Sequence, residues 1–460
     1  MDSQGFISLI PPLIALGLAL WKRRIIPALL IGGLIGALVM ADNKWVFIVN
    51  YLEKVIQVAG DRGNLQLILF GILVGGLIRL METAGGFKGM IRLLEQLNIR
   101  AKRPVFLLTW AIGLLMILEN YSNIMVNGTT VGSLYDKLGI PRTKMAYFLH
   151  SISINWVAII MFNSWGAFYM TLLAGQGISD PFRVVATAMP LNFYCIASLL
   201  MVALTMIFGW NLGKIAGGEP EKMEEKLTEI DDNQKIYSGI GKRDYLLVVV
   251  PVVVLVGTMM ISLFATGNGS LIRGDGTASV FYAVLASIAV LAVMVRLRPK
   301  DQRPPIEKTI YSGIGEFMEV GILLALALTL GALCKDMGTG YYIAGLAQGN
   351  VPTFLMPLIF FFVSCLISFS TGTSYGTFSI MVPLAVPVAE AMGIPLPLMF
   401  AACISGGVFG DNTSPFSDTS VITAISSRIP VVTHVKTQLP YTLISASVAA
   451  VLFVIAGLVA

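Results

Sequence analysis

The chain has 460 residues, of which 56% are hydrophobic and only 12% are charged, about half of the ~25% that is usual in soluble domains. This shortage of charge and a mean hydropathy of +0.81 exclude a soluble globular protein. The net charge of +5 does not indicate a nucleic-acid-binding protein, because the basic residues lie in short connections between apolar runs. Such connections orient a protein in the lipid bilayer, which is the expected partner of this chain.

Long apolar runs predict membrane-spanning helices. Residues 245–265, 280–295 and 441–460 are continuous apolar runs, whereas the strands of outer-membrane barrels are ~10-residue segments of alternating hydrophobicity. A helix crosses the bilayer with about 17–25 apolar residues. We therefore expect an all-α polytopic membrane protein with about 10–13 spanning or half-spanning segments.

The first expected spans flank a basic cluster. Residues 6–20 form a short apolar run, Lys22-Arg23-Arg24 follows it, and a second span is expected at residues 25–40. A cleavable signal peptide carries its positive charge before the apolar run, so we expect the first span to remain in the membrane.

A polar connection over residues 41–64 then leads to a third span near residues 65–80. The following segment, residues 79–103, carries six Lys or Arg against two acids. The positive-inside rule places this segment in the cytoplasm.

A hydrophilic stretch divides the chain into two halves. Residues 211–244 are rich in Gly, Glu and Lys, and we expect them to form a cytoplasmic linker between residues 1–210 and residues 245–460. Each half contains a region where polar residues interrupt apolar sequence, at residues 119–165 and 370–420. Clusters of Gly, Asn, Ser and Pro break helices, so both regions are predicted to contain broken or re-entrant helices.

The two polar regions resemble each other. Paired, interrupted hydrophobic segments in the two halves of a chain point to a secondary-transporter site, and two inverted repeats are the natural expectation. The alternative is chance similarity between Gly-rich membrane helices. The matches at a constant offset of 254 residues are Leu138-Gly139-Ile140-Pro141 with Met392-Gly393-Ile394-Pro395, Tyr121 with Tyr375, Asn163 with Ser417, and Ser164 with Asp418.

The strongest candidate site is the stretch 405–420, SGGVFGDNTSPFSDTS. Unsatisfied backbone groups in hydrocarbon cost several kcal/mol each, so broken helix at membrane depth must be packed in protein or line a wet cavity. Carboxylate and hydroxyl oxygens suit a small hard cation, and acids inside a membrane are functional candidates by default. The alternative is a solvent-exposed loop in which Asp411 and Asp418 cap helix starts.

Other ionisable residues divide by their position. Glu119 follows an apolar run and is expected inside the membrane, whereas Asp136 and Glu390 precede the Gly-Ile-Pro turns and are expected near helix ends. His150 is expected to be a packing residue, with a proton relay as the alternative, because no acid partner can be named for it from sequence. The four cysteines are expected to be buried hydrophobes, and no cofactor is expected.

Residues 407–420, GVFGDNTSPFSDTS, resemble the GDxxSPxSDT signature of NhaC-type Na⁺/H⁺ antiporters of the ion-transporter superfamily. TGTSYGTFSIMVP at residues 371–383 and NSWGAF at residues 163–168 also fit. The resemblance implies a bacterial inner-membrane exchanger with inverted repeats, broken helices and a homodimeric assembly. Together with the polar breaks it leads us to predict that ions or substrate bind at Asp411, Asp418, Ser414, Ser417, Asn412, Thr413, Thr373, Ser374, Glu119, Asn120, Asn123, Ser164 and Trp165, with Asp411, Asp418 and Glu119 as the Na⁺ ligands.

The chain departs from the family pattern at two places. Family members often carry His-Cys where this chain has Asn412-Thr413, and an acid pair where it has Glu119-Asn120. Some relatives exchange organic acids such as malate and lactate alongside Na⁺ and H⁺. Arg142, Arg428 or Lys436 would then bind a carboxylate, or else anchor the helices at the membrane interface.

The leading hypothesis is a secondary transporter that exchanges Na⁺ for H⁺ by alternating access. The alternatives are a Na⁺-coupled transporter of organic acids or amino acids, and a channel. An enzyme is not expected, because the sequence has no HExxH motif and no serine motif that points to His150.

Overall fold

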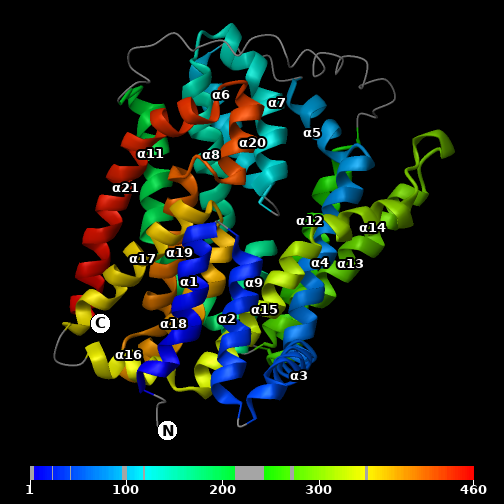
Figure 1. The fold of residues 1–460 in the computed structure, drawn as a ribbon. Helices are drawn as coiled ribbons and strands as arrows, with labels where there is room; N and C mark the ends of the chain where they lie inside the picture. The colour runs from blue at the N-terminus through cyan, green and yellow to red at the C-terminus, as the bar shows by residue number, and fades with distance from the viewer. Residues whose placement is uncertain are drawn as a thin grey trace.

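The computed structural model describes residues 5–22, 24–41, 43–95, 101–117, 120–212, 243–269, 274–347 and 351–460. These residues form helices joined by turns, without a strand among them (Figure 1). Eight helices of the described chain are long and apolar enough to cross a membrane, or ten if each of two bent helix pairs is one span. The predicted all-α membrane fold with broken helices is therefore confirmed, at the lower end of the expected number of segments.

Helices form at the apolar runs predicted for residues 6–20, 25–40 and 65–80, and two more, α3 and α5, form in segments that were predicted as connections. The connection predicted at residues 41–64 contains helix α3, because the apolar residues of this segment recur at helical spacing. Three of these apolar residues are exposed on the surface of α3: Ile48, Leu52 and Ile56. The helices are α1 (Ile10–Lys22), α2 (Ile25–Met40), α3 (Phe47–Ala59), α4 (Arg62–Thr83), α5 (Gly86–Glu95), α6 (Lys102–Leu115), α7 (Asn120–Lys137), α8 (Arg142–Ile159), α9 (Ser164–Gly175), α10 (Pro181–Ala188) and α11 (Phe193–Phe208).

The second half begins with two helices, α12 and α13, at the apolar runs predicted for residues 245–265 and 280–295, and they pack against each other as a hairpin. Most of the predicted linker, residues 213–242, lies outside the described residues. The helices are α12 (Leu246–Thr266), α13 (Gly276–Arg296), α14 (Ile306–Glu316), α15 (Met318–Asp336), α16 (Thr339–Ala347), α17 (Met356–Thr371), α18 (Ser374–Met392), α19 (Leu396–Thr413), α20 (Asp418–Ser427) and α21 (Val431–Val459).

Helix boundaries repeat at the offset found in the sequence. A shift of 254 residues moves α8 onto α19 at both ends, and moves the first residues of α7 and α9 onto those of α18 and α20. The turns before α8 and α19 also match, since Gly139 and Gly393 are left-handed, with φ of 62° and 67°. Glycine adopts this conformation after a helix without steric cost. The similarity between the polar regions is thus a similarity of structure.

The two copies enter from opposite ends of the molecule. The start of α8 lies beside the end of α11, where Lys144 Nζ is 3.0 Å from Asn211 Oδ1. The start of α19 lies instead beside the C-terminus, where Pro395 lines a small cavity with Gly457 and Ala460. In Figure 1 α11 ends near the top of the view, and the C-terminus lies at the bottom. This arrangement is an inverted repeat.

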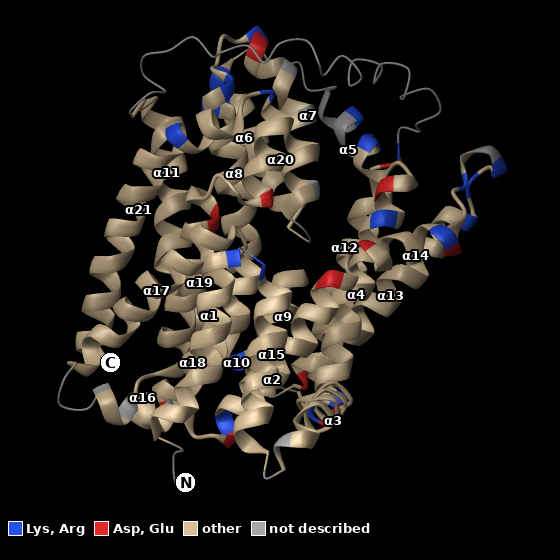
Figure 2. Cartoon of the chain, viewed as in Figure 1, with Lys and Arg blue, Asp and Glu red and all other residues tan. Residues whose placement is uncertain are grey.

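The packing between helices crosses from one half to the other. Helix α2 of the first half packs on α15, and α13 of the second half packs on α4. Within the second half, α19 lies very close to α17: a Cβ atom on Gly410 would be 2.5 Å from the backbone N of Phe369. Charged side chains occur mainly toward the ends of the helices (Figure 2). The few acids at mid-height therefore stand out as candidates for function.

Candidate ion-binding site

The candidate site is built on the break between α19 and α20. Pro415 has no N–H to continue the helix and disfavours helical backbone in the residue before it, and Ser414 is extended, with ψ of 126°. Ser417 then caps α20, because its side chain accepts the N–H of Ser420 at 3.4 Å. The carbonyl end of one helix and the N–H end of the next therefore meet within the molecule, and both carry partial charge.

Asp411 lies in the last turn of α19 and is only 2% exposed. Its carboxylate accepts a hydrogen bond from Ser374 Oγ at 2.7 Å and further ones from the hydroxyls of Ser417 and Thr419. These donors come from α18, the helix break and α20. A buried carboxylate within a shell of hydroxyls is a set of hard oxygen ligands, suited to a proton or a small cation.

A glycine brings α17 and α18 to this break. Gly372, which ends α17 with φ of 70°, lies against it, because a Cβ atom there would be 2.7 Å from the Phe416 carbonyl oxygen. The backbone can turn here only because glycine tolerates the left-handed conformation. The turn places Thr373 and Ser374 beside the carboxylates.

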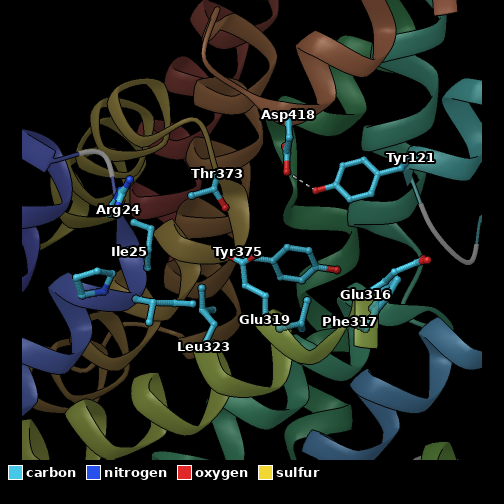
Figure 3. A pocket seen from close by; sticks show the side chains of 13 residues that line it. Arg24, Ile25, Tyr121, Glu316, Phe317, Glu319, Leu323, Thr373, Tyr375 and Asp418 are labelled. Carbon is cyan, nitrogen blue, oxygen red and sulfur yellow. Dashed lines mark hydrogen bonds between the residues drawn. The ribbon is translucent and has the colours of Figure 1, made fainter. Parts of the chain in front are cut away.

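Asp418, the first residue of α20, faces a cavity of about 570 Å³. The hydroxyl of Tyr121 on α7 donates to its Oδ2 atom (Figure 3), and the backbone N–H of Thr419 donates to Oδ1 at 2.8 Å. The two acids of the break thus differ: Asp411 is buried behind hydroxyls, whereas Asp418 is exposed to the cavity. Other residues that line the cavity are Arg24, Glu316, Glu319, Thr373 and Tyr375.

The break between α8 and α9 repeats this geometry with different chemistry. The side chain of Asn163 caps α9 by accepting the N–H of Gly166 at 2.9 Å, as Ser417 does for α20. Tyr375, the counterpart of Tyr121, donates to Ser164, the counterpart of Asp418, at 3.3 Å. Each tyrosine therefore reaches from its own half to the helix start of the other half.

The structure brings some of the predicted residues together at the acids. Ser374 and Ser417 contact Asp411, Thr373 lines the cavity, and Ser414 ends α19. Asp411 therefore does not lie in a solvent-exposed loop, and the residue that caps α20 is Ser417 instead of Asp418.

Other predicted residues lie away from the acids. Asn412 donates to the Tyr194 hydroxyl at 2.9 Å, Thr413 bonds the carbonyl of Phe409 in its own helix at 2.8 Å, and Asn123 holds the carbonyl of Gly113 at 2.7 Å. Their side chains thus donate to groups other than the two carboxylates.

In the first half, the predicted residues lie at the starts of two helices. Asn120, the first residue of α7, is buried, and Ser164, the first of α9, contacts Tyr375. Trp165 is buried, and its ring centroid lies 5.2 Å from that of Tyr375. Glu119 lies outside the described residues.

The basic residue that lines the cavity is none of the three considered from sequence. Arg142, predicted to bind a carboxylate or to anchor, pairs with Asp136 at 2.7 Å, while Arg428 and Lys436 are exposed and do not line the cavity. Arg24 lines it instead. Only the packing of the start of α2 against α18 shows this, since in sequence Arg24 is one of three adjacent basic residues.

A histidine pair next to the acids was also missed. His150 Nδ1 lies 2.9 Å from His434 Nε2, and His150 Nε2 lies 3.1 Å from Thr419 Oγ1, whose hydroxyl also contacts Asp411. His150 is buried as predicted, but its partners come from α20 and α21. The one available signal in the sequence was that the chain has only two histidines.

The molecule combines inverted repeats and broken helices with acids at mid-height beside a cavity. This combination defines a secondary transporter of the membrane and not an enzyme. The profile of the family described as "Na+/H+ antiporter family" matches residues 157–458. The chain therefore belongs to the Na⁺/H⁺ antiporter family.

Relatives of this chain include proteins that are named as antiporters. An uncharacterized protein of Haemophilus influenzae is 28% identical over 99% of this chain and 91% of its own length. The malate-2H⁺/Na⁺-lactate antiporter of Bacillus subtilis is 32% identical over 36% of each chain. The Na⁺/H⁺ antiporter NhaC of Bacillus subtilis is 33% identical over 33% of this chain and 34% of its own. These matches confirm the NhaC-type resemblance.

Two solved transporter structures share the fold. The YdaH transporter of Alcanivorax borkumensis matches with a TM-score of 0.61 and 15% identity, covering 90% of this chain and 89% of its own. MtrF of Neisseria gonorrhoeae, described with a class of antimetabolite efflux pumps, matches with a TM-score of 0.59 and 14% identity, covering 89% and 84%. At this identity the likeness concerns the fold alone.

Proposed function

We propose that the protein exchanges Na⁺ for H⁺ across the bacterial cytoplasmic membrane by alternating access. The observation that carries the proposal is the buried carboxylate of Asp411, enclosed by three hydroxyls at a helix break. A carboxylate in this position binds either a proton or Na⁺, but not both, which is the minimum requirement for coupled exchange. The scheme needs no cofactor beyond the transported ions, and we expect a homodimer in the lipid bilayer.

The hydroxyls around Asp411 suit both occupants. With no cation bound, Ser374, Ser417 and Thr419 donate their hydrogens to the carboxylate. A hydroxyl has one rotatable hydrogen and two acceptor lone pairs. When Na⁺ enters, Ser374 and Ser417 turn their lone pairs toward it, so the carboxylate and hydroxyls together supply its oxygen ligands.

Asp418 supplies the approach to this site from the cavity. Its carboxylate is exposed there and lies seven residues after Asp411, across the break. Glu316 and Glu319 line the same cavity, and Arg24 is the one basic residue among the described lining residues. This excess of negative charge raises the local concentration of cations.

Unequal packing of the two repeats supports alternating access. Helix α18 packs against α15, and α9 packs against both α4 and α15. Among the described residues, their counterparts α7 and α20 make no comparable contacts with α4 or α15. The cavity lies where that packing is missing. If the two repeats exchange conformations, the cavity closes and a second one opens on the opposite side.

The cavity lies toward the end of the molecule that carries the basic segments. Arg79 Nε is 3.5 Å from Glu316 Oε1, and Glu316 lines the cavity. Nearby, Arg298 pairs with Asp244 at 2.8 Å and contacts the carbonyl of Ala84, so the basic segments 79–103 and 296–308 meet. The positive-inside rule assigns this end to the cytoplasm, which makes the described conformation inward-facing.

A flux assay tests the exchange. When a Na⁺ gradient is imposed on liposomes that contain the purified protein, we expect protons to move in the direction opposite to Na⁺. A pH-sensitive dye inside the liposomes reports this movement, and a choline gradient is expected to produce none. Folded protein that moves no protons in response to Na⁺, Li⁺ or K⁺ gradients would overturn the proposal.

A second candidate function is Na⁺-coupled transport of an organic acid or an amino acid. The cavity of about 570 Å³ is far larger than Na⁺ requires, and Arg24 offers a guanidinium to a carboxylate. One relative is named a malate-2H⁺/Na⁺-lactate antiporter. Uptake of radiolabelled malate, lactate or amino acids that depends on Na⁺ and is lost in Arg24→Gln would favour this function.

A further inference from the structure

The two histidines of the chain meet inside the protein although 284 residues separate them. Both are completely buried, His150 on α8 and His434 on α21, and their nearest ring nitrogens are 2.9 Å apart. The inverted repeat does not explain the pair, because the 254-residue offset moves His150 onto Ile404 and places Asp180 opposite His434. The pair is therefore an addition to the repeated framework.

Hydrogen bonds connect the pair to the carboxylate site. His150 Nε2 lies 3.1 Å from the hydroxyl of Thr419, and that hydroxyl contacts Asp411 Oδ1. Thr419 thus joins an imidazole and a carboxylate that do not touch each other. The connection approaches Asp411 from α8 and α21, apart from the cavity that Asp418 faces.

The neighbours of His150 determine where its hydrogen lies. Gln438 Nε2 is 2.5 Å from the carbonyl of Asn412 and 3.3 Å from His150 Nδ1. A carbonyl only accepts, so this atom is the amide nitrogen and donates to Nδ1 as well. Because Nδ1 accepts, neutral His150 carries its hydrogen on Nε2 and donates it to Thr419. Thr419 in turn donates to Asp411, so both hydrogens point toward the carboxylate.

The same reasoning leaves one lone pair of His434 buried. Its Nε2 atom must donate to the accepting Nδ1 atom of His150, so neutral His434 has an unprotonated Nδ1 atom. That atom is buried and has no hydrogen-bond partner among the described residues. Buried polar atoms without partners are rare and call for a functional or structural reason.

We propose that His434, bridged by neutral His150 and Thr419 to Asp411, is a proton-binding site separate from the carboxylates. A proton adds to the Nδ1 lone pair of His434, and one N–H bond forms. One O–H bond of hydronium breaks as the N–H bond forms, water is left, and the imidazolium still donates its Nε2 hydrogen to His150. This proposal rests on the proposed cation–proton exchange and adds a second proton-binding group to it.

Charge couples the two sites. An imidazolium at His434 polarises the chain of hydrogen bonds toward Asp411, and it repels a cation bound at that carboxylate. Sodium binding therefore drives the proton off His434, and protonation drives sodium off Asp411. Charged residues on the helices packed around the pair are Asp411 on α19, Asp418 on α20, Arg142 and Lys144 on α8, Lys436 on α21, Asp136 and Lys137 on α7, and Lys102 and Arg103 on α6. The tyrosines on these helices are Tyr121 and Tyr135 on α7, Tyr147 on α8, Tyr169 on α9, Tyr194 on α11 and Tyr441 on α21.

Counting the protons released by sodium tests the proposal. The full-length protein, purified with a histidine-free tag, is placed in weakly buffered detergent solution near pH 6, and NaCl or choline chloride is added. We expect Na⁺ to release protons from the wild type and about one fewer per chain from His434→Gln, because glutamine keeps a hydrogen bond but binds no proton. Ser445→Ala, a buried change on α21 away from the pair, is expected to match the wild type.

The bridge has its own pair of variants. Thr419→Val removes the hydroxyl between His150 and Asp411 and leaves only the direct charge repulsion, so we expect Na⁺ to release less of the proton on His434. Thr419→Ser restores the hydroxyl and is expected to restore the release. Equal release from the wild type and His434→Gln would overturn the proton-binding site, whereas a wild type that releases no protons would overturn the proposed exchange itself.

Nitrogen-15 NMR of the wild type keeps the proposal testable if the variants do not fold. Labelled histidine marks only His150 and His434 in this chain. On acidification we expect one histidine to change from the neutral to the imidazolium signature, the other to stay neutral, and Na⁺ to reverse the change. Two histidines that remain neutral from pH 8 to pH 5 would exclude proton binding at the pair.

Discussion

The breaks between α8 and α9 and between α19 and α20 share a backbone design and differ in their side chains. Asn163 and Ser417 are equivalent caps, and each following helix start receives a tyrosine from the other half. At the position equivalent to Asp411, however, the first break has Val157. The first break is packed with aromatic rings, whereas the second faces the cavity. Among the described residues, the first break is thus packed and has no acid, whereas the second carries Asp411 and Asp418.

Asp411→Asn should have the largest effect on this comparison, because it removes from the second break the buried carboxylate that the first break lacks. An amide keeps the volume and cannot bind a proton and Na⁺ alternately. We expect Na⁺-driven proton flux in liposomes to fall by about a hundredfold or more, because losing a charge–cation contact in a poorly screened site costs ~3 kcal/mol. Asp136→Asn at the end of α7 is the control, and equal activity of both variants would contradict the assignment.

Asp418→Asn should have a smaller effect, because this carboxylate faces the cavity, where water screens its charge. We expect the Na⁺ concentration for half-maximal flux to rise about tenfold, or ~1.4 kcal/mol, with the maximal rate less affected. Ser164→Ala changes the equivalent residue of the first break and should leave this concentration unchanged. If Asp418→Asn exchanges normally, the carboxylate does not guide the cation.

The two helix caps separate stability from ion binding. Asn163→Ala and Ser417→Ala each remove an N-cap, so each should lower the unfolding free energy by about 1 kcal/mol. Ser417 also donates to Asp411, so only Ser417→Ala should weaken apparent Na⁺ affinity, by about fivefold for one lost polar contact. Thermal unfolding and Na⁺ titration of the flux measure the two effects. Matching losses of affinity in both variants would mean that the breaks act alike.

Removing the hydroxyls of the two tyrosines should have the smallest effects on apparent Na⁺ affinity. The direction of the effect at Tyr121 can nevertheless be predicted. The Tyr121 hydroxyl donates a hydrogen bond to the Asp418 carboxylate and so competes with a cation for this oxygen. Tyr121→Phe removes the competing donor and should improve apparent Na⁺ affinity by about threefold. Tyr375 contacts the neutral Ser164, and Tyr375→Phe should change the affinity by less than about twofold. Weaker Na⁺ binding in Tyr121→Phe would show instead that the phenol oxygen is itself a ligand of the cation.

Local sequence properties were enough to predict most helices and the repeat. Hydropathy located the hairpin of α12 and α13, and the Gly-Ile-Pro turns revealed the offset that relates α8 to α19. Helix α3 was missed because polar residues interrupt its apolar run along the sequence. Within the candidate site, Asp411, Ser417 and Ser374 were predicted from their place in the polar breaks, and Thr419, Tyr121 and Arg24 were not.

The amino-acid sequence was sufficient for the class of protein, the helix breaks and the inverted repeat, because hydropathy, turn-forming residues and internal similarity can all be read along a single chain. Three-dimensional packing decided which polar atoms meet. Tyr121 reaches Asp418 across 297 residues, and His150 reaches His434 across 284. No local pattern encodes these pairs, because each depends on how the helices of the two halves pack against one another.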